Sequence, residues 1–113
     1  MKITNNTLSQ AQLGLLYNCK TWSNKDSLKV YKLKLALQDH VDFFIRRREE
    51  LLHLYGVGDP KEIQSTSEHW SKVVELMNME IEFDFDPIPI ENLPEDLKLS
   101  ANEIGSLIGF LRI

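Results

Sequence analysis

The most regular pattern of apolar residues lies in the middle of the chain, where neither proline nor glycine occurs between Ser23 and Tyr55. The apolar positions there fall three, four or seven residues apart: Val30, Leu33, Leu37, Val41, Phe44, Leu51 and Tyr55. Five others widen the same face: Leu28, Tyr31, Leu35, Ile45 and Leu52. This spacing predicts one long helix over residues 24–55, with a length of about 45 Å. Gly56 follows it and is expected to be its left-handed C-cap.

Shorter helices are predicted on both sides of the long one. The first begins at Thr7, because Thr7–Gln10 has the sequence of a capping box, whose two end side chains each satisfy a free backbone N–H. Counting the long helix as the second, the third begins near Ser67, and its apolar face comprises Trp70, Val73, Val74 and Met77. The fourth follows a second capping box, Ser100–Glu103, and its apolar face comprises Ile104, Leu107, Ile108 and Leu111.

Between the third and fourth helices the period changes from that of a helix to that of a strand. Acidic and apolar residues alternate strictly from Glu80 to Asp86, which is typical of a half-buried strand. Pro87 and Pro89 end this strand or restrict its continuation to a sheet edge. The predicted fold is therefore α+β and mainly α, a single domain over residues 1–113. It has four helices, one of them long and central, and one or two short β-strands near residues 79–90.

Composition places the chain among ordinary folded domains. It has 113 residues, of which 42% are hydrophobic and 27% are charged, enough to bury a core without disulfides. Its one cysteine, Cys19, cannot form an internal bridge, which favours a reducing compartment. No segment reaches the ~20 apolar residues of a membrane-spanning helix, and residues 1–6 lack the apolar stretch of a secretory signal. We therefore expect a complete, soluble, cytoplasmic protein with no membrane partner.

Charge is distributed unevenly about a formal net charge of −4. Residues 1–56 hold nine Lys or Arg against five Asp or Glu, whereas residues 57–113 hold four against twelve. Because the acidic half also carries amphipathic patterns, we expect it to fold against the basic half rather than to form a solvated tail.

Three stretches of the chain share features with a known group of sequences. They are Met1-Lys2-Ile3-x-Asn5-Asn6-x-Leu8, Arg48-Glu49-Glu50-Leu51-Leu52-x-x-Tyr55-Gly56 and Leu97-Lys98-Leu99-Ser100-Ala101-x-Glu103-Ile104. In these the chain resembles a family of small uncharacterised proteins encoded by tailed bacteriophages and prophages. The resemblance implies a phage origin, a helix-rich fold and a location in the bacterial cytoplasm or the virion. It implies no activity and no catalytic residue, and residues 65–70 and 83–90 have no counterpart in it.

The residue types that carry catalysis are present but isolated from one another. No two of His40, His53 and His69 have the spacing of a metal-binding pair on one helix. Cys19 has no sequence signature of a general base, and no glycine-rich phosphate loop occurs. We therefore expect neither an enzyme nor a protein that requires a cofactor or a metal ion.

The four acidic residues of the predicted strand lie on one side of it: Glu80, Glu82, Asp84 and Asp86. Such a row offers oxygen ligands to a hard cation, but a straight strand does not make them converge as a calcium loop does. A solvated face, or a charged edge that prevents strand pairing between molecules, is the favoured interpretation. The role of the row stays open at this stage.

A protein partner is the favoured functional hypothesis. Phe43 and Phe44 are adjacent and point about 100° apart on the long helix, so one narrow stripe cannot bury both. Arg47 and Arg48 follow them, and we expect these four residues to contact the partner. The chain is then a non-enzymatic interaction protein of a phage, acting in virion assembly or by binding a host protein. The partner is a second copy or a foreign protein.

Nucleic-acid binding is the alternative hypothesis. Lys25, Lys29 and Lys32 share one helical face, and Trp22 lies close to them in the sequence. Lysines with a nearby aromatic ring suit phosphate contacts and base stacking. A sequence pI near 5.3 counts against strong non-specific binding of this kind.

Overall fold

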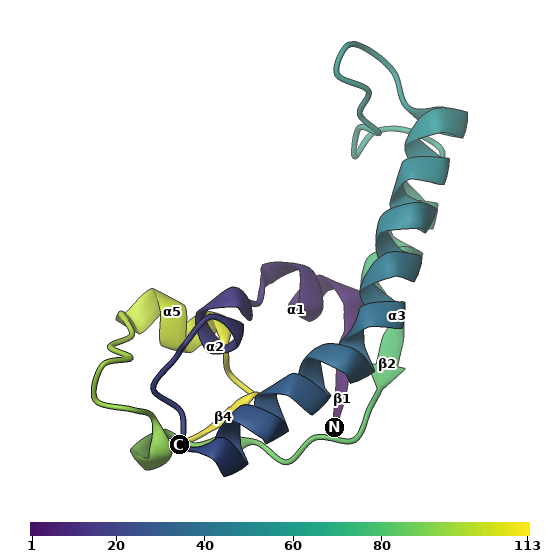
Figure 1. The fold of residues 1–113 in the computed structure, drawn as a ribbon. Coiled ribbons are helices and arrows are strands. Elements are labelled where there is room, and N and C mark those ends of the chain that lie inside the picture. The colour runs from purple at the N-terminus through teal and green to yellow at the C-terminus, as the bar shows by residue number, and fades with distance from the viewer.

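The computed structural model describes all 113 residues, and one long helix runs through its whole length (Figure 1). The elements are β1 (Lys2–Thr4), α1 (Asn5–Gln10), α2 (Gly14–Tyr17), α3 (Asn24–Tyr55), α4 (Trp70–Asn78), β2 (Glu80–Glu82), β3 (Ile88–Pro89), the 3-10 helix η1 (Ile90–Asn92), α5 (Ala101–Ser106) and β4 (Leu111–Arg112). The predicted class, α+β and mainly helical, is confirmed. The molecule is elongated, with extents of 48 × 26 × 22 Å.

Helix α3 confirms the prediction over residues 24–55. The Ser23 hydroxyl caps it by accepting a hydrogen bond from the Asp26 backbone N–H at 3.2 Å. The predicted left-handed C-cap is wrong, because Gly56 has φ −71°. A side chain at Gly56 would collide with the carbonyl oxygen of Leu52. The position therefore requires glycine for close approach to the backbone, not for positive φ.

The N-terminal half of α3 packs into the main core, in the lower part of Figure 1. The 14 buried residues of this core are Leu8, Leu13, Leu16, Trp22, Val30, Leu33, Leu37, Ile81, Phe83, Phe85, Ile88, Leu107, Phe110 and Leu111. Two small sheets border it. β1 and β2 are antiparallel, with Ile3 opposite Ile81, and β3 and β4 are parallel, with Ile88 opposite Leu111. Helices α1, α2 and α5 complete this part, which we call the body.

The C-terminal half of α3 leaves the body (Figure 1) and packs mainly against α4, with Ile63 of the loop beside the two helices. A second cluster of three buried residues, Phe44, Leu51 and Leu76, joins the two helices. Nearer the loop, the rings of Tyr55 and His69 stack with their centroids 3.9 Å apart. Residues 43–78 thus form a helical hairpin that projects from the body.

Asn5 fastens the base of this hairpin to the body. Its side chain is 1% exposed, and its Nδ2 donates to the carbonyl oxygen of Leu76 at 2.9 Å. Its backbone N–H donates to the carbonyl oxygen of Met79 at 3.0 Å. Both acceptors lie at the C-terminal end of α4, where helical carbonyl groups have no partner within the helix. One buried residue therefore donates two hydrogen bonds to the end of α4, where the Leu76 carbonyl oxygen also accepts from the Met79 backbone N–H at 3.3 Å.

Helix boundaries near the N-terminus differ from the prediction. The first helix begins at Asn5 and is capped by Thr4, whose hydroxyl accepts from the Thr7 backbone N–H at 3.2 Å. The expected capping box at Thr7 does not form, since Thr7 already lies within the first turn. The predicted first helix, whose pattern continues to near Asn18, is divided into α1 and α2, so there are five α-helices instead of four. The strands β1 and β4 were not predicted.

The other boundaries agree in part. α4 begins at Trp70, three residues after the predicted start, because the Ser67 hydroxyl accepts from the His69 backbone N–H and holds a turn there. The capping box of Ser100 and Glu103 is confirmed. The helix it begins ends at Ser106, because the chain reverses at Gly109, with φ +93°, to form β4.

The alternating segment follows its predicted burial pattern. Ile81, Phe83 and Phe85 are buried, and the four acidic residues between and beside them are exposed. The strand itself spans only Glu80–Glu82, because β1, its pairing partner, is three residues long. The backbone stays extended beyond it, and one further pair of hydrogen bonds links Met1 and Phe83.

The two faces of α3 predict opposite responses to the same substitution. Leu37 is 1% exposed and belongs to the main core, so Leu37→Ala should lower the free energy of unfolding by about 2–5 kcal/mol. Leu35 is 50% exposed, so Leu35→Ala should change it by no more than about 0.5 kcal/mol. Urea denaturation followed by circular dichroism measures both. Equal losses would show that the helix packs through both faces.

Loss of the Asn5 side chain should weaken the attachment of the hairpin. Asn5→Ala leaves the buried carbonyl group of Leu76 without its side-chain donor, and we expect it to cost about 1–3 kcal/mol of stability. Asn6→Ala is the matched control, because Asn6 is exposed and is the next residue of the same helix. An Asn5→Ala variant as stable as the control in urea would contradict this role.

Candidate protein-binding surface

The hairpin has too few helices to cover its own apolar residues. The predicted apolar face of α4 is only partly buried: Val73 and Met77 are half-buried, Trp70 is 37% exposed and Val74 is 40% exposed. Only Leu76 is fully buried against α3. The arc of apolar side chains on α4 is therefore wider than the contact that α3 provides.

An open groove results on this side of the hairpin. We call it the hairpin groove; its volume is about 470 Å³, and its lining residues are Arg48, Leu51, Leu52, Lys61, Glu62, Ile63, Trp70, Val73, Leu76 and Met77. Seven of these ten are apolar, and the three charged residues belong to α3 and the loop. An apolar floor with a few charged groups at its edge is the usual composition of a site that receives apolar side chains of a partner.

Arg48 contributes an unneutralised charge to the groove. Its guanidinium lies 5.7 Å from the centre of the Phe44 ring, within the range of a cation–π contact. The chain's ion pairs are Lys2–Glu80, Arg47–Glu50 and His69–Glu68, so no carboxylate of the chain pairs with Arg48. A partner that approaches this groove meets a positive charge fixed beside an apolar surface.

A second groove lies beside α3 nearer the body, and we call it the lateral groove. Its volume is about 530 Å³, and its lining residues are Tyr17, Tyr31, Lys34, Leu35, Leu37, Gln38, Val41 and Asp42. The Lys34 ammonium lies 5.6 Å from the centre of the Tyr17 ring. Burial raises the pKa of Tyr17 above its ordinary value, so its phenol is neutral at physiological pH. This groove therefore combines aromatic walls with one cation, Lys34, and one carboxylate, Asp42.

The four residues predicted to contact a partner lie on different sides of the hairpin. Phe44 is 6% exposed and packs between the two helices, so it supports the hairpin and offers no surface. Phe43 is 44% exposed and lies with Arg47 in a smaller cleft of about 110 Å³ on the other flank. Arg48 faces the hairpin groove. As the sequence predicted, one stripe does not bury both phenylalanines.

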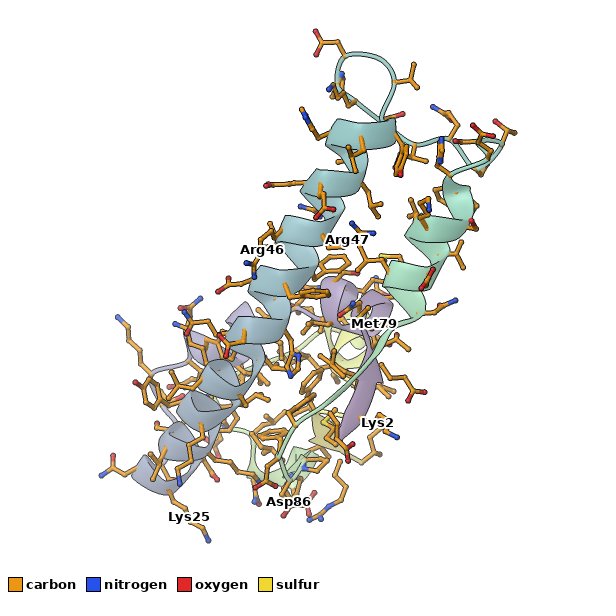
Figure 2. The ribbon with its side chains drawn as sticks, turned by 90° about the vertical axis from the view of Figure 1, so that its right-hand side faces the viewer. Lys2, Lys25, Arg46, Arg47, Met79 and Asp86 are labelled. Carbon is orange, nitrogen blue, oxygen red and sulfur yellow. The ribbon has the colours of Figure 1, made fainter.

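Trp22 does not share a surface with the three lysines of the nucleic-acid alternative. Trp22 is 7% exposed, and its indole N–H donates to the carbonyl oxygen of Leu16 at 3.0 Å, so its ring is not free to stack on a base. The Lys29 ammonium lies 5.5 Å from the centre of the Phe85 ring, close to exposed carboxylates. Figure 2 shows the acidic segment from Met79 to Asp86 running beside the N-terminal half of α3, and Lys25 marks the lower end of that helix. This juxtaposition lowers the attraction for phosphate.

Groups with catalytic chemistry remain apart in the structure. No three His, Cys, Asp or Glu side chains lie where they could hold a metal ion together. Cys19 lines the largest cavity, of about 610 Å³, and the hydroxyl of Thr21 is its hydrogen-bonding partner at 3.3 Å. A hydroxyl group does not act as a general base, so Thr21 does not activate Cys19 as a nucleophile.

No family model, curated protein or solved structure matches this chain. None of its helices has both the length and the apolar character needed to cross a bilayer. Roles for individual residues therefore come from the geometry alone, and of the three largest cavities the hairpin groove has the highest share of apolar lining residues.

The two tryptophans allow the groove to be examined in solution. Trp70 is 37% exposed at the groove, whereas Trp22 is buried in the body. In Trp70→Phe only Trp22 emits, and we expect acrylamide to quench this variant several-fold less than the wild-type protein. Quenching measured in urea, where both indoles are exposed, should be alike and serves as the control. Equal quenching of the two folded proteins would contradict the placement of Trp70.

Proposed function

We propose that this protein is a non-enzymatic protein-binding protein, and that the hairpin groove receives apolar side chains of its partner. One observation carries the proposal: Trp70 and its apolar neighbours line an open groove on a hairpin that projects from the body. Burying such residues is favourable by about 25 cal/mol per Å² of apolar surface, so a partner that covers the groove gains binding free energy. The body need not rearrange for this.

Two features of the groove favour a protein over a small molecule. It is open to solvent, and its lining residues come from two successive helices, α3 and α4, and the loop that joins them, an arrangement in which a third helix or an extended segment fits. Tryptophan and arginine, here Trp70 and Arg48, are also the residue types that most often dominate the energy of protein interfaces. The cleft of Phe43 and Arg47 is smaller, and is the secondary candidate surface.

The biological setting we propose follows from the resemblance to small phage and prophage proteins. In that setting the protein acts in the cytoplasm of a bacterial host, in virion assembly or by binding a host protein. The nucleic-acid alternative gains no support, because Trp22 is buried and Lys29 lies beside an acidic segment.

A comparison of matched variants tests the groove. Trp70→Ser removes the largest side chain of the groove, and Ile108→Ser removes an exposed apolar side chain of the body, 57% exposed. Immobilised wild-type protein and both variants are incubated with bacterial host lysate, and retained proteins are quantified by mass spectrometry. We expect one protein to bind the wild type and Ile108→Ser equally, and to bind Trp70→Ser more than about tenfold less, as loss of a central interface residue does.

Other outcomes assign the function differently. Loss of the same protein in Phe43→Ser but not in Trp70→Ser would move the site to the opposite flank of the hairpin. Equal retention by the wild type and all variants would exclude the hairpin as the binding element.

A further inference from the structure

The exposed face of α3 carries a second apolar pattern that the fold does not use. Large apolar side chains are exposed at Leu28, Tyr31, Leu35 and Ile45, by 53%, 56%, 50% and 38% respectively. They fall on a series of positions that alternate by three and four residues: 28, 31, 35, 38, 42, 45, 49 and 52. These are positions a and d of successive heptads. We call the series the outer stripe; its eight residues are Leu28, Tyr31, Leu35, Gln38, Asp42, Ile45, Glu49 and Leu52.

Internal packing does not account for the outer stripe. The five buried residues of α3 are Val30, Leu33, Leu37, Phe44 and Leu51, which occupy positions c and f of the same heptads. Positions c and f lie on nearly the opposite side of a helix from a and d. Seven residues of the outer stripe are exposed, and the eighth, Leu52, is half-buried at the hairpin groove. The helix thus has one face for its own core and another with no cover.

The length of the outer stripe suits pairing with another helix. From Leu28 to Leu52 it extends over about 36 Å, and five of its eight positions are apolar, as at the a and d positions through which helices pair. The lateral groove follows the first part of the stripe, where its lining includes Tyr31, Leu35, Gln38 and Asp42, and the hairpin groove begins at Leu52. A helix laid on the stripe therefore covers the lateral groove.

The positions that flank the stripe carry an excess of positive charge. At positions e and g the charged residues are Lys25, Lys32, Lys34, Arg46 and Arg48, against a single carboxylate at Asp39. Figure 2 shows Arg46 and Lys25 directed away from the ribbon of α3. None of the five cations forms an ion pair within the chain. Charges at e and g select the partner and orientation in paired helices.

We propose that the outer stripe binds an amphipathic helix of a foreign protein, whose own apolar stripe is flanked by Asp and Glu. This inference deepens the proposed function, on which it rests for the premise that the chain binds a protein, and it specifies the chemistry of that partner. The acidic residues of the partner helix lie against the five cations that form no ion pair within the chain. Its apolar residues contact Leu28, Leu35 and Ile45. Gln38, Asp42 and Glu49 interrupt the apolar contact and fix the register.

A second copy of the chain is a poor occupant of the same surface. In an antiparallel pair that places Leu35 against Ile45 of the other copy, Lys32 faces Arg46 and Lys34 faces Arg48. In a parallel pair, Asp42 and Glu49 each face themselves inside the seam. Both arrangements bring like charges together, which is unfavourable. The charge pattern therefore selects a partner of opposite sign.

Two synthetic helical peptides of four heptads test the proposal with full-length protein. Both have Leu at a and d; the acidic probe has Glu at e and g, and the basic probe has Lys there. We expect fluorescence anisotropy to show the acidic probe binding at least about tenfold more tightly, with the difference shrinking as salt rises. The double variant Lys34→Glu/Arg46→Glu leaves three cations and three carboxylates at e and g, and should abolish the preference. Equal binding of the two probes, or binding of neither, would overturn the proposal.

Substitutions then locate the bound peptide and separate this inference from the proposed function. Leu35→Ser and Ile45→Ser should each lower the affinity for the acidic probe at least about tenfold. Circular dichroism should show both variants folded, because they leave the buried residues of α3, such as Leu33, in place. Trp70→Ser should leave the probe affinity within about twofold, because Trp70 lies outside the stripe. If only Trp70→Ser lowered the affinity for the acidic probe, the outer stripe would not be its binding site. Trp70-dependent capture from lysate without probe binding would retain the proposed function and reject this inference.

The oligomeric state supplies the remaining outcome. Light scattering over a concentration series should show a monomer for the wild type and for Leu35→Ser alike. A stable dimer that Leu35→Ser dissociates would overturn the foreign partner in favour of a second copy.

Discussion

The shape of this protein depends on one mismatch: α3 is longer than the core available to bury it. Its 32 residues correspond to about 48 Å, which equals the longest extent of the molecule. The body supplies 14 buried residues, but they reach only as far as Leu37 on this helix. Beyond that point the helix depends on α4, which has nine residues. The projecting hairpin, its open groove and its junction with the body all follow from this excess length.

Because the hairpin has a small core, its position depends on the junction more than on packing. Three buried residues hold α3 and α4 together, whereas the body has a cluster almost five times larger. Asn5 adds two hydrogen bonds to the end of α4, in a place where water cannot replace them. Regions with few buried apolar contacts open locally at low free-energy cost. The hairpin is therefore the part of the fold that a bound partner stabilises most.

Local signals in the sequence sufficed where neighbouring residues decide the structure. The absence of glycine and proline together with a Ser23 cap defined α3, and Ser100 with Glu103 defined the start of α5. Near the N-terminus two threonines offer equivalent capping oxygens. The choice of Thr4 over Thr7 is linked to the pairing of β1 with β2, which lies more than 70 residues away in the sequence. Such a choice has no local signature.

The candidate surface was the least accessible to sequence analysis, for a related reason. Leu28, Leu35 and Ile45 repeat at helical spacing, so the sequence shows them as a wider version of the core face. Only the positions of the body and of α4 separate the five residues at c and f that are buried from the apolar residues at a and d that are exposed. Likewise, the side on which α4 packs decides that Phe44 is buried and Phe43 exposed. Periodicity thus identifies which residues can be buried on a helix. The three-dimensional arrangement determines which of them the chain buries itself and which it leaves for another molecule.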